Sequence, residues 1–252
     1  YSCAYFKDEN KTLDEAQEDK LDHILSKLQL KEGMTLLDIG CGWGALLIRA
    51  AKKYKIKGCG ITLSSEQEKG FREKIEAEGL SDLLTVKIMD YRDLPESGLE
   101  FDRAVSVGML EHVGRKNYDL FLKCVHSVLK DGGLFLLHFI SALKEHPGDA
   151  WIKKYIFPGG TIPGLREIIY DMAEYNFYTL DIESLRRHYN RTLLCWRNNF
   201  NKHRAEIEKK MGTEFTRMWD LYLASCAATF NNGIIDLHQI LMSKGINNEL
   251  PM

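Results

Sequence analysis

This sequence contains few prolines, has almost no net charge and lacks long apolar segments. Five of its 252 residues are proline, and 34 basic residues nearly balance 36 acidic ones, which leaves a formal net charge of −2. Proteins that bind nucleic acid by neutralising phosphates carry an excess of Lys and Arg, so we expect no nucleic-acid partner. No run of 18 apolar residues occurs, and we therefore expect no membrane-spanning segment.

The spacing of the cysteines argues against metal and disulfide scaffolds. The six cysteines form no Cys-x-x-Cys pair and are scattered as Cys3, Cys41, Cys59, Cys124, Cys195 and Cys226. Zinc sites and disulfide frameworks depend on closely spaced or paired cysteines. We therefore predict no metal site, and we expect reduced thiols and a cytoplasmic location.

The chain opens YSCAYF, with neither a methionine nor an apolar leader. We expect the whole protein to contain residues upstream of this sequence. With 252 residues, 44% of them hydrophobic, the chain itself can bury the core of one α/β domain with an elaboration.

Strand and helix patterns alternate along the first part of the chain. A helix begins after Thr12, whose spacing to Glu15 predicts a capping box. Apolar strand patterns follow at 36–39, 57–63, 83–90, 101–108 and 134–141, and helical patterns between them at 45–54, 65–79 and 117–133. Such alternation is typical of a parallel sheet covered by helices.

Beyond Ser141 the pattern changes. The stretch 142–170 predicts a loop and a short helix, in which we expect Trp151, Tyr155 and Phe157 to cover a substrate, contact a membrane or pack in the core. A strand at 177–185, two long helices at 189–211 and 213–230, and a last strand from Ile234 complete the chain. The sequence thus predicts seven strands, with a helical insertion at about 142–230 over the carboxyl edge of the sheet.

The most informative stretch is LLDIGCGWG, residues 36–44. A buried strand, a glycine turn and a helix follow one another, which is an arrangement that binds nucleotides. The spacing is G-x-G-x-G rather than the G-x-G-x-x-G of dinucleotide folds. Asp38 precedes the turn and suits a cationic ligand group. These features favour S-adenosylmethionine, whose amino acid end carries an ammonium; the alternative is an ordinary strand-to-helix turn.

Polar residues follow the next two strands, where ligands of open α/β sheets bind. Thr62 and Gln67 stand where a dinucleotide fold would place the acidic residue that contacts its ribose, and both can form hydrogen bonds. Tyr91 and Arg92 follow the third strand. The Tyr91 ring is expected to stack on an adenine, although it could instead simply pack against its neighbours.

Six stretches resemble the cyclopropane fatty acid synthases, including their mycolic-acid-modifying relatives: YSCAYF, LLDIGCGWG, GITLSSEQ, VGMLEHVG, LLHFI and WIKKYIFPGG. The resemblance runs from Tyr1 to about Gly245 and covers the catalytic domain of that family. It implies an α/β, Rossmann-like fold of the class I S-adenosylmethionine-dependent methyltransferases. The fold would contain a seven-stranded mixed sheet, and residues 1–252 would form one domain. We expect a further N-terminal domain upstream of this sequence. The cofactor-binding residues predicted are Tyr1, Ser2, Asp38, Gly40, Gly42, Thr62, Gln67, Tyr91 and Arg92.

The resemblance also implies a reaction. These enzymes add the methyl carbon of S-adenosylmethionine to a cis double bond of a phospholipid acyl chain, and a base then removes a proton so that a cyclopropane ring closes. Bicarbonate is thought to be that base, in a cradle that would comprise Cys3, Glu111, His138, Ile140 and Tyr189. Glu111 can accept from its hydroxyl, and His138 and Tyr189 can donate to its oxygens. Burial beside an anion should perturb the pKa of Glu111.

Each cradle residue has a structural alternative. His138 lies in an apolar strand, where a lone histidine is commonly a core residue, and Tyr189 could be a half-buried helical tyrosine. Glu111 could simply be an acidic residue at a helix N-terminus. We favour the functional interpretation for Glu111 because of its motif, and for His138 because of its motif and its expected position at the carboxyl end of the strand. We expect Cys3 to contribute shape or a backbone N–H rather than a nucleophile.

We expect the protein to bind the inner face of a phospholipid bilayer peripherally and transiently. Formation of a homodimer is also possible. The basic stretch 197–210 could touch anionic lipid, although Glu206 and Glu208 favour a solvated helix. A methyltransferase that acts on another lipid or small molecule would need no anion cradle. A catalytically inactive domain that only binds the cofactor would not need Glu111 and His138, so we disfavour that alternative. The glycine spacing disfavours a dehydrogenase.

Overall fold

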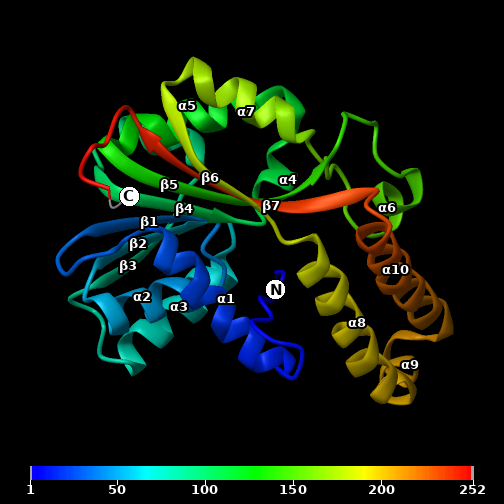
Figure 1. Cartoon of the computed structure of the whole chain (residues 1–252). Coiled ribbons are helices and arrows are strands. Elements are labelled where there is room, and N and C mark those ends of the chain that lie inside the picture. Colours follow the sequence, from blue (N-terminus) through cyan, green and yellow to red (C-terminus); the bar gives the residue numbers. More distant parts are fainter. Residues whose placement is uncertain (1, 251–252) are drawn as a thin grey trace.

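A seven-stranded sheet runs through the centre of the computed structural model, which describes residues 2–250 (Figure 1). In chain order its strands are β1 (Thr35–Ile39), β2 (Lys57–Thr62), β3 (Leu84–Ile88), β4 (Phe101–Val107), β5 (Leu129–Ala142), β6 (Phe177–Ser184) and β7 (Ile235–Lys244). They lie side by side in the order β3-β2-β1-β4-β5-β7-β6. Strands β1 to β5 pair in parallel, whereas β7 is antiparallel to both β5 and β6. The predicted mixed sheet is confirmed.

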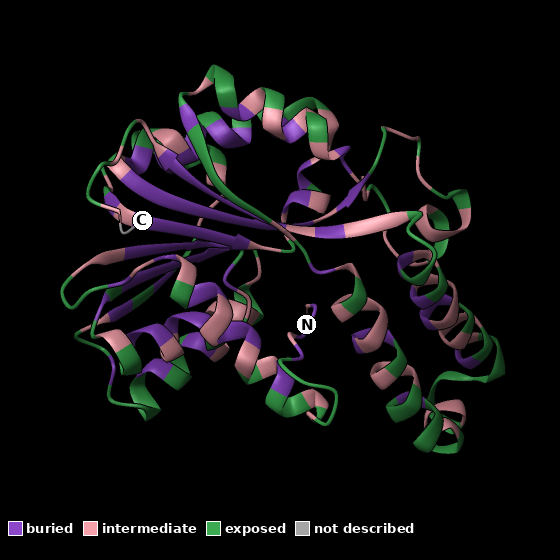
Figure 2. Ribbon diagram, viewed as in Figure 1, coloured by how far each residue is buried: buried purple, intermediate pink, exposed green. Residues whose placement is uncertain are grey.

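Helices cover both faces of this sheet. They are α1 (Leu13–Lys27), α2 (Ala45–Tyr54), α3 (Ser65–Ala77), α4 (Leu110–Val113), α5 (Tyr118–Val128), α6 (Ala150–Tyr155), α7 (Leu165–Glu174), α8 (Arg186–Lys202), α9 (Arg204–Met211) and α10 (Thr213–Asn231), with short 3₁₀ turns η1 (Tyr91–Glu96) and η2 (Arg115–Asn117). Helices α1, α2 and α3 lie on one face, and α5 and α7 lie on the other (Figure 1). The inner strands β1, β2, β4 and β5 are mostly buried between these helices (Figure 2), which agrees with their largely apolar sequences. The edge strands β3 and β6 are largely exposed.

Helix α1 begins as predicted. The Thr12 hydroxyl accepts a hydrogen bond from the Glu15 N–H at 3.3 Å, and a Glu15 carboxylate oxygen accepts from the Thr12 N–H at 2.9 Å. This reciprocal capping box satisfies N–H groups that have no partner inside the helix. The buried face of α1, which carries Leu21, Ile24 and Leu25, therefore has a fixed start and packs against the sheet.

The region after Ser141 differs from the prediction in two ways. The segment 189–211, predicted as one helix, forms α8 and α9, because the backbone of His203 (φ −107°, ψ 11°) leaves the helical region between them. The range 142–230 is also not one insertion. Helix α7 packs on the sheet through the buried Ile168 and Met172, and β6 is a strand of the sheet itself, so the elaboration consists of two separate pieces.

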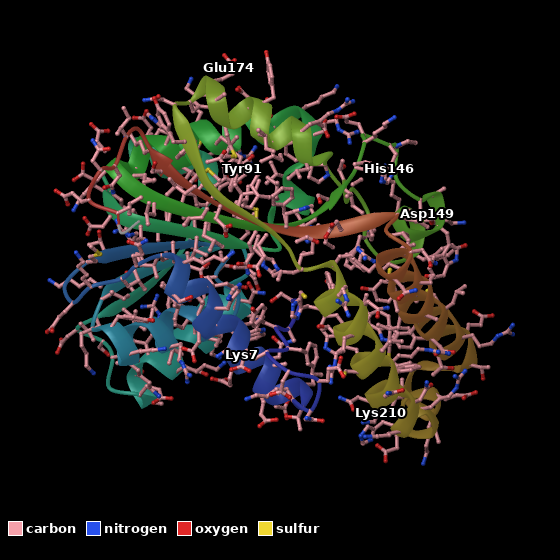
Figure 3. The ribbon with its side chains drawn as sticks, in the orientation of Figure 1. Lys7, Tyr91, His146, Asp149, Glu174 and Lys210 are labelled. Carbon is pink, nitrogen blue, oxygen red and sulfur yellow. The ribbon has the colours of Figure 1, made fainter. Side chains whose placement is uncertain are left out.

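The second of these pieces is a helical arm, α8 to α10, that extends beyond the strand ends. Lys210, in α9, lies at its far end (Figure 3). Where the arm meets the sheet, Leu193 of α8, Phe230 of α10 and Leu237 of β7 form an apolar cluster that also buries Cys3. The N-terminal segment is thereby fixed between the arm and α1.

Candidate active site

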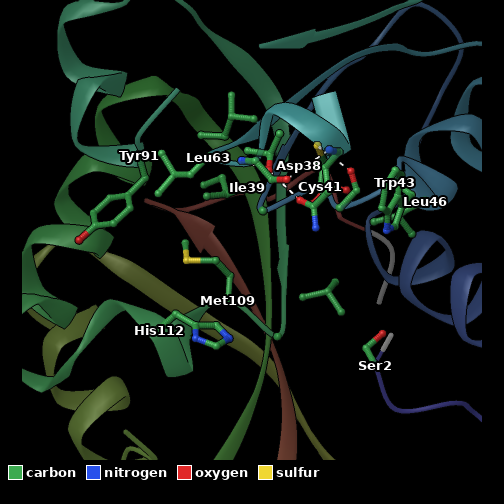
Figure 4. A pocket seen from close by; sticks show the side chains of 18 of the residues that line it. Ser2, Asp38, Ile39, Cys41, Trp43, Leu46, Leu63, Tyr91, Met109 and His112 are labelled. Carbon is green, nitrogen blue, oxygen red and sulfur yellow. Dashed lines mark hydrogen bonds between the residues drawn. The ribbon is translucent and has the colours of Figure 1, made fainter. Parts of the chain in front are cut away.

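A cavity of about 830 Å³ opens at the carboxyl ends of β1, β2 and β4. Its lining comes from the glycine turn after β1, the segments after β2 and β3, the segment from Val107 to Val113, and residues of α1 and the N-terminal segment (Figure 4). Strand β1 has β2 on one side and β4 on the other, so the chain reverses its direction of winding at this point. Such a switch point is where open α/β sheets bind their ligands.

The three glycines of the turn serve different purposes. All have positive φ values: 81° at Gly40, 55° at Gly42 and 81° at Gly44. A Cβ atom at Gly44 would overlap the ring of Phe71, and one at Gly40 would lie 2.9 Å from the Met109 side chain. A Cβ at Gly42 would meet no atom within 4 Å. Gly42 therefore exposes its backbone to the cavity, where the sequence predicts a close approach to a ligand.

Asp38, at the end of β1, is a buried acid on the cavity wall. Its side chain is 3% exposed, and burial raises its pKa to about 7, an effect that the positive charge of Lys20 opposes. A cationic ligand group beside Asp38 would favour the ionised carboxylate. The predicted role of Asp38 thus has a physical basis in this cavity.

The other predicted cofactor residues surround the same cavity. Thr62 donates its hydroxyl proton to the Gln67 side-chain oxygen at 2.7 Å, and both residues line the cavity. Tyr91 lines it as well, and its ring packs nearly perpendicular to that of Phe121, with 5.3 Å between the ring centres. Arg92 is exposed and already holds Asp90 in an ion pair at 2.5 Å.

Ser2 lines the cavity too, whereas Tyr1 lies outside the described residues.

Glu111 is hydrogen-bonded to one other residue of the predicted cradle, Ile140. One carboxylate oxygen, Oε1, accepts a hydrogen bond from the Ile140 N–H at 2.7 Å. The other, Oε2, is buried and has no partner within residues 2–250. Burial raises the pKa of Glu111 to about 7 against the opposing effect of the hydrogen bond from Ile140. A buried acceptor without a donor is costly, so a ligand that donates a hydrogen bond to Oε2 would fit at this position.

His138 lies two residues before Ile140 on β5, and the two side chains therefore point to the same face. The imidazole is 1% exposed, and burial lowers its pKa to about 3, so the ring is neutral. Its Nδ1 lies 3.2 Å from the amide nitrogen of Gln239. With the Gln239 amide in this orientation its nitrogen donates, so Nδ1 accepts and Nε2 carries the ring proton. Strand β5 continues to Ala142, so His138 is inside the strand rather than at its carboxyl end.

The remaining cradle residues meet in the apolar cluster at the base of the helical arm. Cys3 is buried there, with Ile140 and Tyr189 packed against the same cluster. The Tyr189 ring lies 4.5 Å from that of Phe230. The Cys3 thiol donates to the Ala4 carbonyl at 3.2 Å, and burial raises its pKa strongly, so it stays protonated. Cys3 and Tyr189, which are 186 positions apart in the sequence, thus lie at the same apolar cluster.

The sequence analysis assigned no role to two charged or titratable residues of the cavity wall, Lys20 and His112. Lys20 lines the cavity from α1 and is 8% exposed. Its spacing of four from both Ala16 and Ile24 places it on the buried face of that helix, and a charged residue there is a signal that could have revealed it. His112 also lines the cavity (Figure 4), with its ring 6.4 Å from that of Phe157.

No helix within residues 2–250 is long and apolar enough to cross a membrane. Six free cysteines are present, of which Cys195 and Cys226 are partly exposed.

Comparison with known proteins places this site in a family. The family described as mycolic acid cyclopropane synthetase matches residues 1–240. The chain is 44% identical over 251 residues to the cyclopropane-fatty-acyl-phospholipid synthase of Escherichia coli K12, which covers 99% of this chain and 63% of that protein. It is 45% identical to a probable fatty acid methyltransferase of Pseudomonas putida, with 97% and 63% covered. The chain thus spans less than two thirds of the length of these relatives.

A solved structure of a related enzyme has the same fold. The mycolic acid cyclopropane synthase CmaA1, complexed with SAH and CTAB, superposes with a TM-score of 0.89 at 33% identity, over 97% of this chain and 90% of that one. Both the sequence and the fold match over nearly the whole chain. This chain therefore belongs to the mycolic acid cyclopropane synthetase family.

Proposed function

We propose that this chain transfers a methylene group from S-adenosylmethionine to the cis double bond of an unsaturated phospholipid acyl chain, which closes a cyclopropane ring. The observation that carries the proposal is the position of Glu111. It connects α4, whose neighbouring residues line the cofactor cavity, to Ile140 in the apolar cluster, and it keeps one buried oxygen without a partner. The family membership supports the reaction class.

The cavity residues fit S-adenosylmethionine, which supplies an electrophilic methyl carbon when bound. Asp38 would hold its ammonium, the exposed backbone of Gly42 would approach its amino acid end, and Tyr91 would cover its adenine. The hydrogen-bonded pair of Thr62 and Gln67 would contact its ribose through neutral groups. The SAH in the related CmaA1 structure supports this assignment.

We propose bicarbonate as the base that removes the proton. Glu111 Oε2 has no hydrogen-bond partner within residues 2–250, and a carboxyl group with a pKa near 7 can either accept from the bicarbonate hydroxyl or donate to one of its oxygens. The Nε2–H of the neutral His138 is a second donor. Tyr189 and Ile140 would complete the cradle from the apolar side, and the buried aromatic residues around them exclude water that would compete for a reactive cation.

The acyl chain would enter from a membrane surface. Helix α6, beside the apolar cluster, exposes Tyr155 next to Lys153 and Lys154, a combination that suits anionic lipid headgroups. We propose peripheral, transient contact with the inner face of a bilayer through this surface. The cytoplasmic location expected from the reduced thiols agrees with such contact.

The test incubates the protein with vesicles of cis-unsaturated phospholipid, S-adenosylmethionine and bicarbonate, and analyses the fatty acids by proton NMR. Ring protons support the proposal. A methylated alkene would instead favour the alternative, a methyltransferase without ring closure. If the vesicles yield no product while calorimetry shows cofactor binding, the reaction needs either the expected upstream domain or a different substrate. Glu111→Gln should slow turnover and leave cofactor affinity nearly unchanged, whereas Glu174→Gln, on the exposed end of α7, should change neither (Figure 3).

A further inference from the structure

Lys20 is a buried cation on the wall of the cofactor cavity. It projects from α1, is 8% exposed, and lines the cavity together with Ser2 and Asp38. In the view of Figure 4, Ser2 and Trp43 lie on the side of the cavity away from Tyr91. Lys20 is hydrogen-bonded to Ser2, so it lies at the end of the cavity away from the expected adenine position.

Two hydrogen bonds hold the Lys20 ammonium within residues 2–250. The ammonium donates to the Ser2 hydroxyl at 3.0 Å and to the Gln17 side-chain oxygen at 2.8 Å. An ammonium carries three N–H donors. The third N–H donor of Lys20 has no acceptor within residues 2–250, and the Lys20 side chain lines the cavity. A buried ammonium gains most from an anionic partner, because burial deprives it of water.

Asp38 presents the opposite charge in the same cavity. Both groups are buried, yet no ion pair between Lys20 and Asp38 forms within residues 2–250; each acts on the other only through its longer-range charge. The other fully charged base on the wall, Arg92, is already paired with Asp90. Two separated buried charges of opposite sign are costly unless a ligand carries complementary charges to both. An α-amino acid group, with its ammonium and carboxylate on one carbon, is such a ligand.

We propose that Lys20 and Asp38 form a zwitterion subsite, in which Lys20 binds the carboxylate of the amino acid end of S-adenosylmethionine and Asp38 binds its ammonium. This inference rests on the proposed function and adds Lys20 as a specificity-determining residue for the cofactor. The two hydrogen bonds to Ser2 and Gln17 hold the ammonium in place before the cofactor binds, so little side-chain freedom is lost on binding.

The test compares S-adenosylmethionine with its decarboxylated analogue, which keeps the sulfonium and the ammonium but has no carboxylate. Affinities are measured by calorimetry without lipid, so no turnover is needed. A charge-assisted hydrogen bond in a buried site corresponds to about 10- to 100-fold in affinity. The wild type should prefer S-adenosylmethionine by about that factor, and Lys20→Met should lose the preference by weakening S-adenosylmethionine alone.

Two further variants separate this role from a structural one. Lys20→Arg keeps the positive charge and should recover part of the preference, and it also tests the proposal if Lys20→Met fails to fold. Lys52→Met, which removes an exposed lysine of α2, should leave both affinities unchanged. If Lys20→Met weakens both ligands equally, Lys20 only positions Ser2 and α1, and the subsite is wrong. A wild type that binds neither ligand would overturn the proposed cofactor itself.

Discussion

Replacing Glu111 with glutamine should stabilise the protein more at alkaline than at acidic pH. The glutamine side chain has nearly the same shape and can still accept the hydrogen bond from the Ile140 N–H through its oxygen. What it removes is the ionisation of a carboxyl group whose Oε2 is buried without a donor within the described residues. The comparison therefore isolates the free energy of holding a carboxylate in this site.

The magnitude follows from the pKa of Glu111, which burial raises from 4.5 to about 7, against the effect of its backbone hydrogen bonds. Below pH 4.5 the carboxyl is protonated in both the folded and the unfolded chain. As the pH rises from there to 7, the unfolded chain loses its proton first, so folding becomes less favourable, and above pH 7 the full penalty applies. The wild type should thus lose about 2 to 3 kcal/mol between pH 5 and pH 8 through this group, a loss that Glu111→Gln avoids.

Urea unfolding of both proteins at pH 5, 6, 7 and 8 measures this directly. The free energy of unfolding of Glu111→Gln minus that of the wild type should rise steadily with pH. Glu174→Gln serves as the control, since that glutamate is exposed and its difference from the wild type should stay constant. A Glu111→Gln difference that does not change with pH would refute the conclusion that this carboxylate is destabilised in the folded protein.

Three further substitutions test the site and the fold. Gly42→Val should abolish S-adenosylmethionine binding in calorimetry, because the side chain would enter the cavity; unchanged binding would contradict the placement of Gly42. Gly44→Ala should lower the free energy of unfolding by about 1 to 3 kcal/mol in a urea titration, since its Cβ would overlap a core phenylalanine ring. Burial alone would raise the pKa of Glu183, but hydrogen bonds from His23 and Lys27 outweigh this and hold it at about 2. Wild-type stability should therefore fall as the pH drops from about 4.5 towards 2, and Glu183→Gln should reduce that fall; identical acid curves would show that these contacts contribute nothing.

Much of the fold and part of the site follow from short-range sequence patterns. The capping box at Thr12, the strand at 36–39 and the glycine turn after Asp38 were predictable because each depends on residues within a few positions of one another. The same holds for Gly42, whose positive φ and exposed backbone belong to the turn itself. The position of the cavity followed as well, since parallel strands direct their carboxyl ends to one edge.

The tertiary structure alone decided what distant segments do to one another. His138 was predicted at the carboxyl end of its strand, whereas β5 continues to Ala142. Cys3 and Tyr189 meet only because the helical arm folds back against the N-terminal segment.

Lys20 is the clearest case. In sequence its spacing places it on the apolar face of α1, but only the packing of the folded chain brings it near the buried Asp38. Its role depends on burial and on the charge it faces, and both are properties of the folded chain as a whole. Local patterns fix the geometry of each turn and helix, whereas the electrostatics of the site come from contacts between segments that the sequence keeps apart.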